Sequence, residues 1–121
     1  MKPLAALAVA TLLSLPAIGI AQDSLVGKYS ASYSSTGIRA TLQSVSIDIT
    51  SVENGAVKGT GYRSDSGCRG EYQLEGSVKG NNIRLRGKGG PAGDCTFNIN
   101  GTIDGNAIAA KWGPHDLLFT K

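Results

Sequence analysis

The chain has 121 residues, a formal net charge of +3 and 40% hydrophobic residues, which fits one small domain. Without Lys2, eleven Lys and Arg residues face nine Asp and Glu residues, a net charge of +2. This slight excess, interspersed with acidic residues, argues against a nucleic-acid partner.

Residues 1–21 have the pattern of a secretory signal peptide. Lys2 gives a positive start, residues 4–15 are almost entirely apolar, and Gly19 and Ala21 are small residues placed for cleavage after Ala21. The alternative is an uncleaved N-terminal anchor, although the apolar run is short for a membrane span. We therefore expect a secreted or periplasmic protein with a single domain at residues 22–121 and no further membrane span.

The rest of the chain shows no helical periodicity. Turn signals recur about every 8–12 residues, and the segments between them alternate apolar and polar residues, which is typical of short antiparallel strands. This pattern predicts about eight strands, at 25–33, 38–50, 55–63, 70–79, 82–88, 95–104, 107–112 and 115–120.

The clearest signal is a hairpin that occurs twice. Residues 72–86 and 97–111 each alternate aromatic, aliphatic and glycine positions up to a Gly-Asn turn, at Gly80 and Gly105, and then alternate again. Pairing each copy about its turn places apolar residues opposite one another. The predicted partners are Val78 with Ile83, Gly76 with Leu85, Glu75 with Arg86, Ile103 with Ile108, Gly101 with Ala110 and Ile99 with Trp112.

The predicted fold is all-β: an antiparallel up-and-down meander of about eight strands that closes into a small barrel. A two-sheet sandwich satisfies the same pattern. Several glycines, among them Gly59, Gly61, Gly76 and Gly87, share the apolar face with bulky residues. They either relieve crowding in a filled barrel or leave space for a ligand, and we favour the first interpretation.

The second predicted strand contains a change of phase. Ile38, Ala40 and Leu42 share one parity, whereas Val45 and Ile47 share the other. We therefore expect a β-bulge or a strand break near residues 43–44.

Cys68 and Cys95 are the only cysteines, and in an exported chain such a pair predicts a disulfide. The bond would tie the segment before one strand to the start of another at one end of the sheet. A redox or metal role is disfavoured because there is no Cys-x-x-Cys pair and a single histidine cannot complete a zinc site. No cofactor or metal is predicted.

The chain offers few groups for catalysis. His115 is the only histidine, and its neighbour Asp116 should point to the opposite face of a strand. We expect His115 to be an exposed residue after the turn at 113–114. Residues 64–67 resemble a fragment of a calcium-binding loop, but no glutamate completes a twelve-residue EF-hand loop, so we interpret them as a polar turn. The sequence therefore predicts a protein that is not an enzyme.

Three cations alternate along one predicted strand, at Arg84, Arg86 and Lys88, with Arg69 and Lys79 as possible neighbours. They form either a surface for an anionic partner or a solvated face in which Glu75 pairs with Arg86, and the second interpretation is favoured.

Aromatic residues complete the set of candidates. Trp112 belongs by its parity to the core, whereas Tyr29, Tyr33 and Tyr62 are candidates for a barrel mouth or a contact surface. The candidate ligand or partner surface is therefore Tyr29, Tyr33, Tyr62, Arg69, Arg84, Arg86, Lys88, Trp112, His115 and Asp116.

The chain resembles small secreted β-barrels of the calycin type, and avidins more than lipocalins. The resemblance is carried by the segments at residues 25–29, 55–62, 72–76 and 115–121. It implies an eight-stranded meander, with Asp116 where an avidin-like aspartate would reach a ligand. Avidins line their biotin pocket with several tryptophans and this chain has Trp112 alone, so the biotin-site pattern is not matched.

Three functions remain open at this stage. The favoured one is a non-enzymatic binding protein that acts through its loops, near residues 63–69 and 88–95, and its outer face. The alternative is a barrel that binds a small apolar ligand, as avidins and lipocalins do, which needs an internal cavity. A hydrolase is the least favoured.

Overall fold

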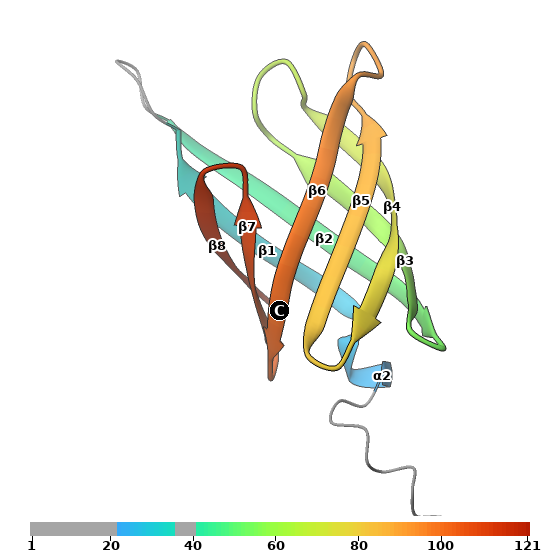
Figure 1. Ribbon diagram of the computed structural model, residues 1–121. Helices are drawn as coiled ribbons and strands as arrows, with labels where there is room; N and C mark the ends of the chain where they lie inside the picture. Colours follow the sequence, from blue (N-terminus) through green and yellow to red (C-terminus); the bar gives the residue numbers. More distant parts are fainter. Residues whose placement is uncertain (1–21, 36–40) are drawn as a thin grey trace, which may run out of the picture.

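The computed structural model describes residues 22–35 and 41–121, and these form a closed eight-stranded antiparallel barrel (Figure 1). Each strand pairs with the next in the chain, and β8 returns to β1 at Ser30 and Thr120. The elements are α2 (Gln22–Leu25), β1 (Gly27–Ser34), β2 (Leu42–Glu53), β3 (Ala56–Arg63), β4 (Gly70–Lys79), β5 (Asn82–Gly89), β6 (Cys95–Asp104), β7 (Ala107–Trp112) and β8 (His115–Thr120). The predicted barrel is confirmed, and the sandwich alternative is wrong.

The signal-peptide prediction at residues 1–21 and the first residues of the predicted second strand, 38–40, lie outside the described residues. Within the described part of the chain, no helix has the length and apolar character needed to span a membrane.

Both repeated hairpins have the predicted register. In the first, Val78 lies opposite Ile83 and Glu75 opposite Arg86. In the second, Ile103 lies opposite Ile108 and Gly101 opposite Ala110, but the ladder ends at Asn100 and Lys111, one pair short of the predicted pairing of Ile99 with Trp112. The two-residue turns at 80–81 and 105–106 have left-handed glycines, which is why the Gly-Asn pattern set the register correctly.

The interior of the barrel is filled with apolar side chains, and no polar or charged residue among those described is fully buried. Aromatic rings form a continuous column, with ring centroids 5.5 Å apart between Tyr72 and Phe97 and 4.9 Å apart between Phe97 and Trp112. A Cβ added to Gly61 would lie 2.7 Å from the Phe97 ring, and one added to Gly76 would overlap the Arg84 carbonyl on the next strand. These glycines therefore allow neighbouring groups to approach closely and do not border an empty space.

The position predicted for the bulge is wrong. The β1–β2 ladder runs without interruption from Leu42 to Ile49, and Leu42 simply points outward, with 74% of its surface exposed. The register shift lies instead between Ile49 and Ser51. This shift turns the side chain of Val52 toward the core. The parity of the core-facing residues in β2 therefore changes between Ile49 and Val52.

The two ends of the barrel differ in construction. At one end, which we call the turn end, two-residue turns at 54–55, 80–81 and 105–106 connect the strands and α2 lies across the opening (Figure 1). Leu25, expected in a strand, belongs to α2 and is buried, and its carbonyl accepts a 2.7 Å hydrogen bond from the Tyr29 hydroxyl. The opposite end, the loop end, has the longer connections at 64–69 and 90–94 and the turn at 113–114.

The filled interior leads to a test of core packing. We expect Gly61→Ala to lower the free energy of unfolding by about 1–3 kcal/mol, because the added methyl group would be forced against the Phe97 ring. Urea denaturation monitored by Trp112 fluorescence measures the change, with the outward-facing Thr102→Ala as a control. An unchanged or increased stability of Gly61→Ala would show that the barrel has room beside this position.

Candidate functional site

The inward-facing positions of the barrel change character at the loop end. Along most of the interior they are aliphatic, aromatic or glycine. In the layer nearest the loop end, alternation along the strands places Tyr33, Gln43, Arg63 and His115 on the inward side, next to Trp112. This is the layer of the interior where polar groups gather, so the loop end is the candidate functional site.

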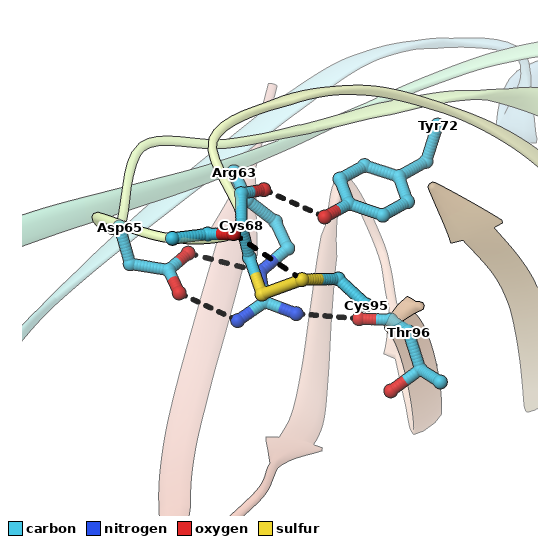
Figure 2. The surroundings of a disulfide bond; sticks show 7 residues. Arg63, Asp65, Cys68, Tyr72, Cys95 and Thr96 are labelled. Carbon is cyan, nitrogen blue, oxygen red and sulfur yellow. Dashed lines mark hydrogen bonds and ion pairs between the residues drawn. A yellow bond between two sulfur atoms is a disulfide. The ribbon is translucent and has the colours of Figure 1, made fainter. Parts of the chain in front are cut away.

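Arg63, at the end of β3, crosses the mouth of the barrel at this layer (Figure 2). Its guanidinium donates from Nε and Nη2 to the two carboxylate oxygens of Asp65, at 2.9 and 2.6 Å, and from Nη1 to the Thr96 carbonyl on β6 at 2.5 Å. It also lies 4.9 Å from the centre of the Trp112 ring. One side chain thus joins β3, β6, β7 and the loop that begins at residue 64.

The pair of charges is well shielded from solvent, with 15% of the Arg63 side chain and 22% of the Asp65 side chain exposed. The hydrogen bonds from Arg63 lower the pKa of the Asp65 carboxyl, and burial opposes this effect. The same hydrogen bonds raise the pKa of Arg63, which remains charged. Both charges are therefore part of the folded structure at neutral pH.

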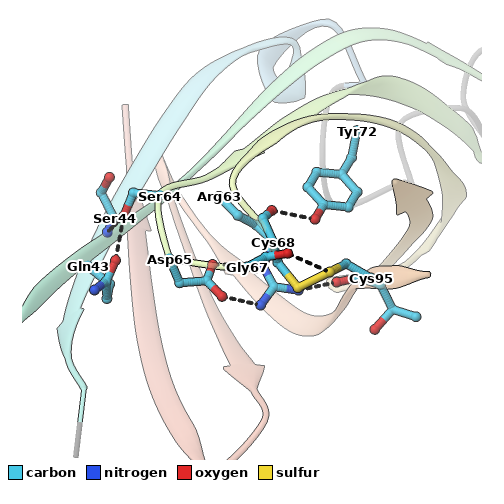
Figure 3. Close-up of polar contacts among 10 residues, drawn as sticks. Gln43, Ser44, Arg63, Ser64, Asp65, Gly67, Cys68, Tyr72 and Cys95 are labelled. Atoms are coloured by element: carbon cyan, nitrogen blue, oxygen red, sulfur yellow. Dashed lines mark hydrogen bonds and ion pairs between the residues drawn. A yellow bond between two sulfur atoms is a disulfide. The ribbon is translucent and has the colours of Figure 1, made fainter. Parts of the chain in front are cut away.

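The predicted disulfide between Cys68 and Cys95 is confirmed, and it ties the 64–69 loop to the start of β6 (Figure 2). The Cys68 carbonyl also accepts a 2.6 Å hydrogen bond from the Tyr72 hydroxyl. At the other side of the loop, Ser64 donates to the Gln43 side chain and accepts from the Ser44 amide, both at 2.8 Å (Figure 3). The 64–69 loop is thus fastened at both of its ends to the barrel wall.

His115 and Tyr33 meet at the seam where β8 returns to β1. Their ring centroids are 4.5 Å apart with a tilt of 36°. His115 is half-buried in this contact, so the expectation of an exposed turn histidine is wrong. Asp116 points outward, as its strand position predicts, and pairs with the Lys111 ammonium at 2.5 Å on the outer surface.

The remaining candidates lie elsewhere. Tyr29 is buried near the turn end and not at a mouth or contact surface, because its ring packs in the core and its hydroxyl bonds to the backbone of α2. Tyr62, Arg84, Arg86 and Lys88 are exposed on the outer face, and Arg69 is exposed in the 64–69 loop.

Glu75 and Arg86 are opposite one another as expected. Both ion pairs found among the described residues nevertheless involve other side chains, Arg63 with Asp65 and Lys111 with Asp116. On the same strand as Arg86, the Arg84 guanidinium donates a hydrogen bond to the side-chain oxygen of Asn100, at 3.1 Å.

The polar turn expected at residues 64–67 is the start of the fastened loop. Its Asp65 carboxylate is occupied by Arg63, and the Cys68 amide donates to the Asp65 carbonyl at 3.2 Å. In residues 22–35 and 41–121, no cluster of three His, Cys, Asp or Glu side chains could hold a metal ion.

The sequence reasoning included Arg63 only within the 63–69 loop and did not name it as a site residue, although a signal was present. Val57, Gly59, Gly61 and Arg63 share one parity, so the core face of β3 continues directly into a charged residue. A charge in phase with the core at a strand end is a marker of a polar mouth.

Comparisons of the chain with protein families, curated proteins and solved structures found no match.

The hydrogen-bonded, half-buried Arg63–Asp65 pair predicts a pH-dependent contribution to stability. Because the folded-state pKa of Asp65 is lowered, the contribution is present above the usual value of 3.8 and is lost as the pH falls through the lowered pKa. We expect Asp65→Asn to destabilise the protein at neutral pH, and the difference from the wild type to shrink in acid. Urea denaturation of both proteins, from neutral pH into acid, measures the difference in their free energies of unfolding.

Asp116→Asn is the matched control for this experiment, because its ion pair with Lys111 leaves 79% of the Asp116 side chain exposed and should contribute little. Equal effects of the two substitutions at neutral pH would contradict a special role for the pair at the mouth.

Proposed function

We propose that this protein is an exported, non-enzymatic binding protein that recognises another protein through the loop end of its barrel. The observation that carries the proposal is the contrast between an apolar, filled interior and a polar layer at the loop end that is held by Arg63 and by the Cys68–Cys95 disulfide. A rigid barrel with a loop fastened at both of its ends is a suitable scaffold for recognition.

The packing of the interior supports a surface function over binding of a small apolar ligand. Ligand-binding barrels bury most of their ligand in a cavity. Here Phe97, which has no exposed surface, lies between Tyr72 and Trp112, and Gly61 offers no free space beside it. The alternative of an avidin-like or lipocalin-like ligand site would require this column of rings to move apart.

The fastening of the 64–69 loop supports the same conclusion. Ordering a flexible loop on binding costs free energy, which a loop held in place before the encounter avoids. The disulfide and the hydrogen bonds of Ser64 and Tyr72 supply that order in advance. Arg69, Pro91 and Asp94 are exposed around the disulfide and offer the first contacts to a partner.

The surroundings of the polar side chains favour binding over catalysis. Three donors of the Arg63 guanidinium already bond within the protein, to Asp65 and to Thr96. His115 contacts Tyr33, while the neighbouring Asp116 carboxylate pairs with Lys111 on the opposite face of the strand. Among residues 22–35 and 41–121, no carboxylate pairs with His115, whereas general-base catalysis by histidine commonly uses an orienting carboxylate.

Export to the periplasm or the medium is part of the proposal. The N-terminal segment carries the features of a signal peptide, and a disulfide persists in the oxidising compartments to which such a peptide leads.

The proposal is tested by partner capture with charge-reversed variants. Immobilised protein is incubated with an envelope extract of the source organism, the retained protein is identified by mass spectrometry, and its affinity is then measured with purified components. We expect Arg69→Glu, at the loop end, to weaken binding by about tenfold through the loss of a contact and of charge attraction.

Lys79→Glu is the matched control, since it makes the same change in charge on an exposed residue at the turn end. It should leave the affinity unchanged. A partner that is lost with Lys79→Glu and kept with Arg69→Glu would contradict recognition through the loop end.

A further inference from the structure

β6 extends beyond the end of its neighbour β7. The β6–β7 pairs run from Asp104–Ala107 to Asn100–Lys111, and the chain turns into β8 just after Trp112. The β5–β6 pairs continue as far as Gly89 and Cys95. Among the pairs described, residues 95–99 of β6 therefore have a strand on one side only, and Figure 1 shows the β7–β8 hairpin ending well short of the loop end of β6.

The backbone of this segment offers hydrogen-bonding groups toward the open side. The Thr96 carbonyl already accepts a hydrogen bond from the Arg63 guanidinium. In an antiparallel strand the N–H and C=O groups of every second residue point to the same side. Those of Asn98 therefore face the open side together with the carbonyl of Thr96.

A hollow of about 220 Å3 lies along this edge. It is lined by Arg63, Thr96, Asn98, Trp112 and Gly113. The edge is thus accessible, and it is bounded by a strand on one side and by the β7–β8 turn and the Trp112 ring on the other. An accessible strand edge of this kind is a template for an added strand.

Two positive charges lie on the outer face of the strand that pairs with this edge, and the exposed Asp94 carboxylate lies just before the segment. Lys88 lies opposite Thr96 and Arg86 opposite Asn98 on β5, both exposed on the outer face. An added strand would place its outward side chains two strand spacings from them, about 10 Å, which is about one Debye length at 0.1 M salt, so the attraction is long-range and weakens as salt is added. Glu75, opposite Arg86 on β4, is one strand farther away.

We propose that the open edge of β6 at residues 95–99 binds an extended acidic segment of a partner polypeptide, which adds to the barrel wall as a short extra strand. The proposal rests on the proposed function and names the kind of segment that the loop end recognises. Backbone hydrogen bonds to Asn98 hold the segment, Arg86 and Lys88 select its acidic outward side chains, and inward side chains pack beside Trp112.

The test uses isotope-labelled protein produced from its full chain and a short blocked peptide in which valine alternates with glutamate. We expect saturable changes in the amide signals of residues 95–99 and in the indole signal of Trp112, together with slower hydrogen exchange of the Asn98 amide. A peptide with lysine in place of glutamate should bind at least about tenfold more weakly. Equal affinity for the two peptides would overturn the acidic preference.

Asn98→Pro isolates the backbone contribution. Proline removes the N–H on the open side, a position that an edge strand tolerates, whereas Asn98→Ala keeps it. We expect Asn98→Pro to weaken peptide binding by about tenfold and Asn98→Ala to leave it close to the wild type.

If Asn98→Pro fails to fold, the glutamate peptide methylated on alternate backbone nitrogens gives the same comparison with unchanged protein. Equal binding of the methylated and unmethylated peptides, or of the two variants, would overturn strand addition.

Two further outcomes would also overturn the proposal. One is the absence of changes at residues 95–99 with millimolar peptide. The other is a concentration-dependent dimer that shields this edge and is not displaced by peptide, which would make a second copy of the chain its occupant.

Failure of this inference is distinguishable from failure of the proposed function. A captured partner that is lost with Arg69→Glu but kept with Asn98→Pro would leave the loop end as the recognition surface and remove the edge of β6 from it.

Discussion

The guanidinium of Arg63 is the interaction on which the loop end depends. Arg63 continues the core face of β3 to the end of the strand. Its guanidinium donates hydrogen bonds to the Asp65 carboxylate and to the Thr96 carbonyl, and it lies over the Trp112 ring. Without it, the start of the 64–69 loop would lose its ion pair, and the Thr96 carbonyl near the start of β6 would lose its hydrogen-bond donor. A buried ion pair is not a large source of stability in itself, but removal of one partner is costly, which favours a single arrangement of the mouth.

Around this contact the two ends of the barrel differ in construction, and the loop end is the one that we propose for recognition. The turn end is closed by short turns, by α2 and by the hydrogen bond from Tyr29 to the Leu25 carbonyl. The loop end carries the disulfide and the Tyr33–His115 contact that draws the β7–β8 hairpin toward β1. Between them the interior is packed around Phe97, so the core holds the two ends in a fixed relation.

Local patterns predicted most of the fold because an antiparallel meander is made of contacts between neighbours in sequence. The Gly-Asn turns set the register of two hairpins, and the apolar parity identified the core. The bulge was misplaced because Leu42 is apolar and yet points outward, an orientation that the hydrophobic pattern alone does not reveal.

The candidate site at the loop end was only partly predicted. Tyr33, Trp112 and His115 were candidates, but the contacts of Tyr33 with His115 and of Arg63 with Thr96 join residues far apart in the chain. Such contacts depend on the closure of the barrel and on the unequal lengths of β6 and β7.

The central claim is that the barrel is filled and acts through its surface. Native mass spectrometry of the protein purified from the envelope of its own host tests this claim most directly. We predict a mass equal to that of the chain from residue 22 onward, less the two hydrogens lost in the Cys68–Cys95 disulfide, with no small molecule attached. A stoichiometric bound mass in the range of a lipid or a small metabolite would contradict the account, because it would require a cavity where the side chains of Tyr72, Phe97 and Trp112 are packed.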